Sequence, residues 1–328
     1  MGVGFFFILS GFVLAWSWTG RSTRPGFYLD RFARIYPLHI ATTIIAAAIA
    51  MAIGHGSGRG LIASLVLVQA WLPDVWRMGG NAPSWSLSCE AFFYATFPFV
   101  NSRVANLSLR RIALCGGAIC AAMAFYVICY ALYARASLPY ASALSPYTFP
   151  GYRIAEFALG LLLASAMRRG WRPGISLRQA LWATGSWYGL LALADWIAAS
   201  HGIRIGQERG IPLGALDLAF LPAAVLLVAA GASEDLTGVK TFLSGPIHHA
   251  LGKASFALYL VQMLIIERVA STRSASLADA KGAATFAATI TTCILVSWLA
   301  HKYVERPLNT IIRERGRSVG NSLSKKIG

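Results

Sequence analysis

Apolar segments long enough to cross a membrane recur along almost the whole of this 328-residue chain. A spanning helix needs about 17–25 mostly apolar residues, and backbone groups inside a bilayer must be hydrogen-bonded within the protein. Repeated Leu, Ala, Ile and Val segments therefore predict helices. The segments run over residues 3–18, 37–54, 61–72, 84–100, 112–134, 153–168, 180–199, 211–231, 251–270 and 282–304. We expect an all-α, polytopic integral membrane bundle with about nine or ten transmembrane segments.

The composition agrees with a membrane protein. Hydrophobic residues make up 56% of the chain and charged residues only 13%, whereas soluble domains carry about 25% charged residues. The formal net charge of +16 does not indicate nucleic acid, because the basic residues gather in alternate short loops. That pattern is typical of the Lys/Arg excess on the cytoplasmic side of a membrane. We therefore expect the lipid bilayer, and no nucleic acid, as the partner of this charge.

The cysteines do not indicate a metal site or a disulfide framework. All five lie in apolar segments, without paired metal-ligand spacing, and are expected to be small buried hydrophobes. They are Cys89, Cys115, Cys120, Cys129 and Cys293. The chain also lacks a phosphate-binding glycine loop and a Gly-x-Ser-x-Gly motif. We expect no bound metal or cofactor and no Ser-His-Asp chemistry.

The basic clusters predict how the chain crosses the membrane, because such clusters stay in the cytoplasm. They lie in 19–36, 101–111 and 168–179 and after residue 304. Region 61–100 must then cross an odd number of times, so one of its pieces, 61–72 or 84–100, is expected to be a half-helix or re-entrant segment. The same orientation places Met1 on the outer face, so we expect one helix to be absent before it.

The chain is expected to form one membrane domain over residues 1–312, followed by a basic cytoplasmic tail over 313–328. Pro307 is predicted to end the last helix, since proline cannot continue a regular helix interior. The tail is polar and basic and is expected to be flexible and close to the lipid surface.

An acidic residue, Glu90, lies in the apolar run from Trp85 to Tyr94. A carboxylate at membrane depth costs about 2.5–3.5 kcal/mol on insertion scales, so such residues are functional candidates by default. In a helix Ser86, Glu90 and Tyr94 share one face and are predicted to line a polar cavity. Alternatively, Glu90 pairs with an arginine of a neighbouring helix and only holds the bundle together.

Two arginines, Arg31 and Arg34, precede the expected helix that starts at Pro37. Their i, i+3 spacing presents both guanidinium groups on one helical face, and arginine binds phosphate groups in bidentate fashion. They are predicted to bind a phosphorylated ligand on the cytoplasmic side, with ordinary positive-inside anchoring as the alternative. His39 is either a proton carrier or a hydrogen-bonded histidine at a helix interface.

Several further runs contain polar residues within apolar surroundings. The run Gly4–Phe12, with Ser10, is either a helix-packing face or part of an active site. Arg153 and Glu156 are predicted to form a local ion pair one helical turn apart. Tyr259 follows Ser255 at helical spacing in the run Leu251–Leu260.

Three histidines are weaker candidates. His248 and His249 are expected in a cytoplasmic loop with Lys240, where they either contact a soluble ligand or are solvated. His301 lies near the end of the last apolar segment.

These runs, taken in order, resemble the membrane-bound acyltransferase 3 family. The matching pieces are Gly4–Phe12, Arg31–Pro37, Trp85–Tyr94, Arg153–Ala164, Leu251–Leu260 and Glu305–Pro307. The resemblance implies a bacterial inner-membrane enzyme that moves an acetyl- or succinyl-type acyl group from a cytoplasmic acyl-coenzyme A to a hydroxyl group. The implied acceptors are carbohydrates or glycolipids, such as surface polysaccharides.

The resemblance suggests roles for the residues singled out above. Arg31 and Arg34 are expected to bind the coenzyme A phosphates. Glu90, Ser86, Tyr94 and Ser10 are expected in the catalytic centre, where a hydroxyl group loses its proton and an oxyanion develops. The residues expected to contact the acceptor are Trp85, Arg153, Glu156 and Tyr259.

The chain departs from the family pattern in three places. The family has a basic residue followed by a histidine, the expected general base, on a helix before the run that matches Gly4–Phe12. Gln262 stands where many members have a histidine, and Ala91 where many have a second acid. Two alternatives to an active enzyme therefore remain. One is a truncated, non-catalytic member, and the other is a proton-coupled transporter that uses Glu90.

Overall fold

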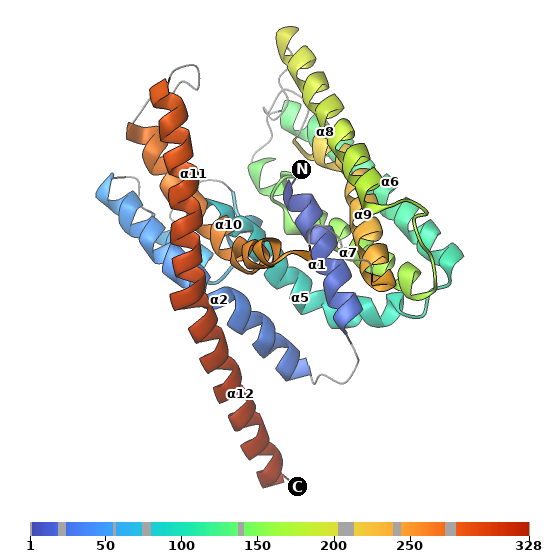
Figure 1. Cartoon of the computed structure of the whole chain (residues 1–328), viewed down its shortest axis with the longest axis horizontal. Helices are drawn as coiled ribbons and strands as arrows, with labels where there is room; N and C mark the ends of the chain where they lie inside the picture. The colour runs from blue at the N-terminus through green and yellow to red at the C-terminus, as the bar shows by residue number, and fades with distance from the viewer. Residues whose placement is uncertain are drawn as a thin grey trace. The chain divides into compact units, whose positions relative to one another are not determined.

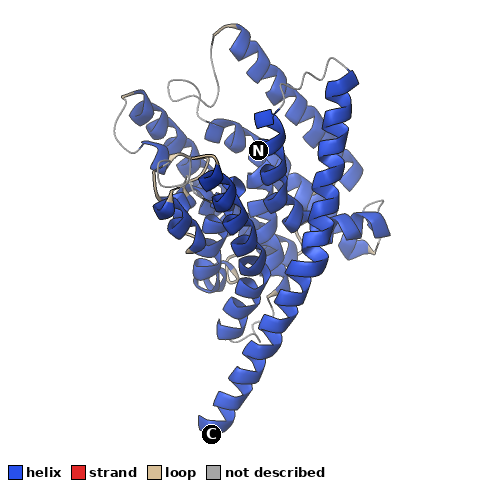
Figure 2. Cartoon of the chain, turned by 90° about the vertical axis from the view of Figure 1, so that its left-hand side faces the viewer, coloured by secondary structure: helices blue, strands red, loops and turns tan. Residues whose placement is uncertain are grey.

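All regular elements in the described part of the chain are helices. The computed structural model describes residues 2–18, 24–54, 57–73, 80–136, 141–202, 213–238, 244–272 and 280–327, without the side chains of 24, 213, 271–272, 280 and 317–327. Figure 2 shows the helical content of these ranges. The prediction of an all-α protein is confirmed.

The helices fall into two compact units, which are described separately. Unit 1 comprises residues 1–21 and 89–241, and unit 2 comprises 22–88 and 242–328. Unit 1 holds α1 (Gly2–Ser17), α6 (Leu109–Arg135), η3 (Ala141–Leu144), α7 (Pro150–Arg168), α8 (Leu177–Ser200) and α9 (Leu213–Thr237). Unit 2 holds α2 (Arg24–Ala52), α3 (Gly58–Leu65), η1 (Gln69–Trp71), η2 (Ala82–Ser84), α10 (Pro246–Thr272), α11 (Ala280–Ala300), η5 (His301–Glu305) and α12 (Arg306–Ile327). The division falls within α5 (Trp85–Val104).

Five helices of the described residues are long and apolar enough to cross a membrane. They are Pro25–Ala52, Leu109–Arg135, Gly214–Thr237, Pro246–Ala270 and Lys281–Gly316. Helix α1 is apolar but shorter. Helix α3 has only 8 residues, which corresponds to about 12 Å at 1.5 Å per residue. The piece around 61–72 is therefore too short to span, as expected for a half-helix, and the number of the other spans stays a prediction.

The centre of unit 1 is the close contact between α1 and α7. A Cβ atom on Gly11 would lie 2.1 Å from the carbonyl oxygen of Phe157, and one on Gly160 would lie 2.1 Å from that of Ile8. Only glycine at these two positions lets the backbones approach so closely, as small residues do in membrane helix pairs. The run Gly4–Phe12 is thus a packing face, which was one of its two interpretations.

Stacked aromatic rings fill the space beside this contact. The Phe7 ring lies edge-on to Phe93, with centroids 5.0 Å apart, and Phe93 stacks on Phe157 at 4.9 Å. All three side chains are buried. Aromatic pairs in these geometries add stabilisation beyond their buried area, so α1, α5 and α7 form one apolar core.

Two predicted helix boundaries in unit 2 are wrong. Pro37 does not start a helix but lies inside the 29-residue helix α2. Pro307 does not end one, because α12 continues to Ile327 (Figure 1). A five-residue π-turn, η5, ends at Glu305, two positions before Pro307, and the Arg306 amide donates to the His301 carbonyl across it. Such a turn changes the backbone pairing where a proline ring would otherwise clash with the preceding turn.

Helix α12 also passes through the predicted boundary between residues 312 and 313. It packs along α2, where Gly316 faces Leu29 closely enough that a Cβ would lie 2.1 Å from a Leu29 methyl group. The division into a membrane domain and a tail stays a prediction.

His39 is fully buried where α2 meets α3. Its Nε2 lies 2.8 Å from the Ser64 carbonyl oxygen, and its Nδ1 lies 3.3 Å from the Thr43 hydroxyl. Since a carbonyl only accepts, Nε2 carries a proton. The geometry agrees with the interpretation of His39 as a hydrogen-bonded histidine at a helix interface.

The glycine contact predicts a clear difference between two alanine variants. Gly11→Ala is expected to destabilise the protein by about 1–3 kcal/mol, because the methyl group overlaps a backbone carbonyl. Gly117→Ala on α6 is the control, since a Cβ there meets nothing within 4 Å. Thermal unfolding in detergent should show a lower transition temperature for Gly11→Ala alone. Equal transition temperatures would contradict the packing role.

Candidate functional site

A cationic pocket in unit 2 is the best-defined candidate site. Its volume is about 580 Å³, within the range of about 300–1,000 Å³ typical of ligand sites. Three parts of the unit supply its walls, namely α2, the first turns of α10, and the helix that runs from η5 into α12. The lining residues are Arg34, His248, His249, Gly252, Lys253, His301, Glu305, Arg306, Asn309, Thr310 and Arg313.

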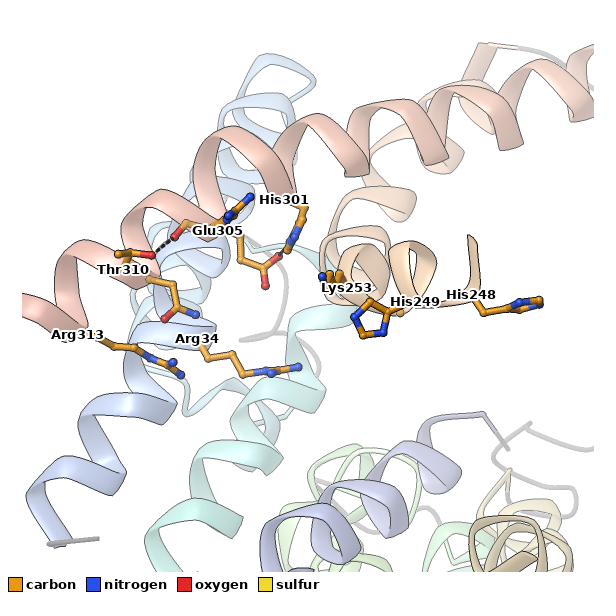
Figure 3. Close-up of a pocket in the computed structure, with 11 residues that line it drawn as sticks. Arg34, His248, His249, Lys253, His301, Glu305, Thr310 and Arg313 are labelled. Atoms are coloured by element: carbon orange, nitrogen blue, oxygen red, sulfur yellow. Dashed lines mark hydrogen bonds and ion pairs between the residues drawn. The ribbon is translucent and has the colours of Figure 1, made fainter. Parts of the chain in front are cut away.

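The charge of the pocket is strongly positive. Arg34, Lys253, Arg306 and Arg313 carry permanent positive charges, and Glu305 is the one carboxylate among the lining residues. Figure 3 shows Arg34 extending from α2 below the His301–Glu305 pair, toward the side of α10 that carries His249. Such an arrangement attracts anions, and guanidinium groups suit phosphate.

Two ion pairs involve residues that line the pocket, one within a single wall and one between two helices. Glu305 Oε2 lies 2.9 Å from His301 Nδ1, within the π-turn and at the end of α11. Arg313 Nε lies 3.1 Å from Asp30 Oδ1 and so connects α12 to α2. No carboxylate of the described residues lies within ion-pair distance of Arg34, Lys253 or Arg306. These three cations are therefore the groups available for an anionic ligand.

The predicted phosphate-binding arginines are placed differently from each other. Arg34 lines the pocket, as the phosphate interpretation expects. Arg31 is not among the lining residues, and its guanidinium lies 5.8 Å from the Phe27 ring centroid. His248 and His249 lie in the first turns of α10, so the expectation of a loop is wrong. Lys240, which was expected in the same loop, lies outside the described residues.

Ser86 and Tyr259, 173 positions apart, meet in unit 2. The Tyr259 hydroxyl donates to Ser86 Oγ at 2.8 Å and approaches the Pro83 carbonyl oxygen at 2.9 Å. Asn81 Nδ2 donates to the Leu260 carbonyl at 2.7 Å, which ties the same segment to α10. The structure thus brings together one predicted catalytic and one predicted substrate-binding residue.

Glu90 and Tyr94 form a second polar pair, in unit 1. The Tyr94 hydroxyl donates to Glu90 Oε2 at 3.0 Å, one turn along α5. Trp85 at the start of this helix is half-buried, and Ser10 is half-buried on α1. The expected face of α5 is therefore present, while the catalytic roles of its residues stay predictions.

Arg153 is a fully buried charge in unit 1. With no exposed surface, it donates to Glu156 Oε1 at 2.6 Å, to Asp217 Oδ2 at 2.5 Å and to the Tyr147 carbonyl at 2.9 Å. The predicted Arg153–Glu156 ion pair is present. The second carboxylate that pairs with Arg153 is Asp217 on α9. It was not singled out from the sequence, although an acid in an apolar segment is the same signal that marked Glu90.

Comparison with known proteins decides the family. The sequence profile described as an acyltransferase domain, that of the acyltransferase 3 family, matches residues 1–302. The chain is 32% identical over 342 residues to acyltransferase MdmB of Streptomyces mycarofaciens, with 96% of this chain and 82% of that protein covered. The chain belongs to the acyltransferase 3 family. No solved structure matches it.

Membership confirms the resemblance and makes the protein an acyl-transferring enzyme with membrane helices. Sequence reasoning missed part of the pocket of this acyltransferase, namely the combination of Lys253, Arg306 and Arg313. Lys253 and Arg306 lie in two of the family runs, but nothing in the sequence places them opposite Arg34. Among the described residues, no group of three or more His, Cys, Asp or Glu side chains is arranged to hold a metal ion.

The shared guanidinium of Arg153 predicts an order of stabilities. Arg153→Met leaves two buried carboxylates without their common cation and should cost about 3–5 kcal/mol, the range for breaking a buried ion pair. Asp217→Asn keeps the Arg153–Glu156 pair and should cost clearly less. Thermal unfolding of both variants in detergent measures the difference. A larger loss for Asp217→Asn would show that Arg153 is not the centre of the cluster.

Proposed function

We propose that this chain is a bacterial inner-membrane O-acyltransferase. It moves an acetyl- or succinyl-type group from a cytoplasmic acyl-coenzyme A to a hydroxyl group of a carbohydrate or glycolipid. The observation that carries the donor assignment is the cationic pocket, because Arg34 from one family run and Lys253 and Arg306 from two others line it together. A coenzyme A thioester presents phosphate groups, which such a set of cations binds well.

The orientation of the chain supports a donor from the cytoplasm. The pocket draws on two of the basic clusters that the positive-inside rule assigns to that side, 19–36 and the segment after 304. A phosphorylated donor made in the cytoplasm would reach these cations without crossing the membrane. The apolar helices hold the site at the membrane, where lipid-linked acceptors are found.

The reaction requires a base and a stabilised oxyanion. The acceptor hydroxyl oxygen attacks the thioester carbonyl carbon, its proton passes to a base, the C–S bond breaks, and the coenzyme A thiolate takes a proton. We assign Glu90 and Tyr94 to proton handling, since the phenol and carboxylate already share a hydrogen bond. Ser86 and Tyr259 in unit 2 supply hydroxyl donors, and Ser10 on α1 is a further candidate for a catalytic role.

The residues expected to contact the acceptor suggest its chemical class. Trp85 offers an aromatic face on which a sugar ring can stack. Arg153 pairs with both Glu156 and Asp217 within unit 1, so we assign Arg153 and Glu156 a supporting role in acceptor binding. The biological role that we propose is the O-acetylation of surface polysaccharides.

Cell-surface glycans provide the direct test of the function. Wild-type and deletion strains are compared by mass spectrometry, and the deletion strain should lack an acyl mass on one glycan. Membranes from expressing cells should also transfer label from acyl-coenzyme A to the same glycan. Identical glycans in both strains, with no transfer in membranes, would contradict the proposal. Flux of a substrate without any acyl donor would favour a transporter instead.

Glu90→Gln tests the proton-handling role. The amide keeps the size of the side chain but cannot accept a proton, so transfer should fall by about 10²-fold, as for loss of a group in acid–base catalysis. The rate constant of label transfer in membranes with matched expression is the measurement. Glu314→Gln on α12, an exposed acid outside the pocket, is the control. A normal rate for Glu90→Gln would remove this carboxylate from the mechanism.

A further inference from the structure

We propose that Asn81 is a positioning residue for the acyl-transfer reaction. It holds the turn before α5 against α10, so that the Tyr259 and Ser86 hydroxyl groups stay together as hydrogen-bond donors. Asn81 makes and breaks no bond in the reaction and acts only through Tyr259. The inference rests on the proposed function, in which these two hydroxyl groups serve the reacting centre, and extends it to a residue outside the catalytic set.

Hydrogen bonds tie the turn before α5 to two consecutive residues of α10. Asn81 Nδ2 donates to the Leu260 carbonyl oxygen at 2.7 Å. The Tyr259 hydroxyl lies 2.9 Å from the Pro83 carbonyl oxygen and 2.8 Å from Ser86 Oγ, and Ser86 Oγ lies 3.1 Å from the same Pro83 carbonyl. Both hydroxyl groups therefore reach one backbone carbonyl. The position of that carbonyl relative to α10 decides whether the two hydroxyl groups meet.

Burial separates the residue that positions from the residue that reacts. Asn81 is only 3% exposed and Leu260 is fully buried, whereas Tyr259 is half-buried. A side chain without exposed surface does not bind a substrate directly, but it can fix the backbone of its neighbours. The partly exposed Tyr259 is the member of this set that a substrate can approach.

The side chain of Asn81 carries a cost that packing alone does not explain. Asn81 Oδ1 is buried and has no hydrogen-bond partner among the described residues, which is unfavourable for a polar atom. Leucine has nearly the same shape and would avoid this cost. What asparagine contributes in its place is the bond from Nδ2 to the Leu260 carbonyl. The donor of Asn81 is therefore the feature that a positioning role requires.

A buried polar network holds the backbone of Asn81 from the other side. Gln69 Nε2 donates to the Ser84 carbonyl oxygen at 2.8 Å, and Ser84 Oγ donates to the Asn81 carbonyl oxygen at 2.6 Å. Ser84 Oγ also lies 3.3 Å from Ser64 Oγ on α3. Gly80 fits beside Ser64 because a Cβ would overlap the serine side chain. These bonds satisfy non-helical backbone, as the interior of a membrane protein requires, and fix the turn relative to α3.

The chain enters this network through a strained turn. Leu67, between α3 and η1, has a φ of 59°, in the left-handed region that residues other than glycine rarely adopt. Such conformations persist where the surrounding structure determines them, and they gather at functional sites. The turn leads directly into η1, which carries Gln69.

A double-mutant cycle tests the coupling between Asn81 and Tyr259. The measurement is kcat for label transfer from acetyl-coenzyme A to the membrane glycan, at matched expression. Tyr259→Phe should lower kcat about 10²-fold, as loss of an oxyanion donor does. Asn81→Leu should also lower it about 10²-fold, because a displacement of about 1 Å is enough.

The double variant decides the cycle. It should be only about 10²-fold slower than the wild type, since both changes remove the same donor. KM for acetyl-coenzyme A should stay within about twofold of the wild-type value in all three variants. A double variant about 10⁴-fold slower, the product of two independent effects, would overturn the inference.

A spectroscopic signal reports the position of the phenol without any reaction. 3-Fluorotyrosine is placed at position 259 of the full chain in detergent micelles, and its fluorine NMR resonance is recorded. Asn81→Leu should shift this resonance in the same direction as Ser86→Ala, which removes the hydroxyl partner of the phenol. An unchanged resonance in Asn81→Leu would overturn the inference.

Thr42→Val is the matched control. Thr42 is buried in the same unit, and its hydroxyl donates to carbonyl groups of its own helix, those of Leu38 and His39. This variant loses a buried polar group but should keep the wild-type kcat and fluorine resonance. If Asn81→Leu does not assemble, Asn81→Ser replaces it in both experiments, because serine is too short to reach the Leu260 carbonyl.

The two measurements separate this inference from the proposed function. If wild-type membranes transfer no acyl group, the proposed function fails, while the fluorine resonance still decides whether Asn81 positions the Tyr259 hydroxyl. If transfer proceeds and Asn81→Leu changes neither kcat nor the resonance, the function stands and the inference is overturned.

Discussion

The placement of charge is the constraint on which the rest of this structure depends. Only 13% of the residues are charged in a chain built for a bilayer, where an unpaired charge is strongly unfavourable. The charged residues described above are accommodated in two ways. Arg153 is buried and shared by two carboxylates in unit 1, whereas Arg34, Lys253 and Arg306 gather around an open pocket in unit 2. The first arrangement stabilises the packing of unit 1, and the second leaves positive charge available to a ligand.

Local backbone features make both arrangements possible. Gly11 and Gly160 allow α1 and α7 to approach closely. Gly4 on α1 leaves room for the Glu156 carboxylate, since a Cβ there would lie 2.8 Å from a carboxylate oxygen. In unit 2 the π-turn before Pro307 turns Arg306 toward the pocket. Small residues and an irregular turn thus decide where charged side chains point. Family motifs that look like packing elements therefore act on the polar sites as well.

The candidate site was visible in the sequence only in part. Glu90, Ser86 and Tyr259 were recognisable because charged or polar residues are rare in apolar segments, and Arg34 because it lies at i, i+3 spacing from Arg31. Lys253, Arg306 and Arg313 looked like ordinary basic residues at the ends of helices, where cytoplasmic charge is expected anyway. Asp217 carried the same signal as Glu90 and was overlooked. The helix boundaries predicted from Pro37 and Pro307 were wrong. The local rule for proline does not consider that a longer helix or a π-turn can accommodate the ring.

The sequence by itself determined the helical, membrane-embedded class and the acyltransferase family. Both follow from information that is local, namely the length of apolar segments and the order of short motifs. Only the tertiary structure decided that Ser86 meets Tyr259, that Asp217 joins Arg153, and that Arg34 shares a pocket with residues of α10 and α12. The first two contacts join residues that are 173 and 64 positions apart in the sequence, and the third joins segments that are farther apart still. Such contacts depend on side-chain direction and on helix packing, and the spacing of residues along the sequence predicts neither.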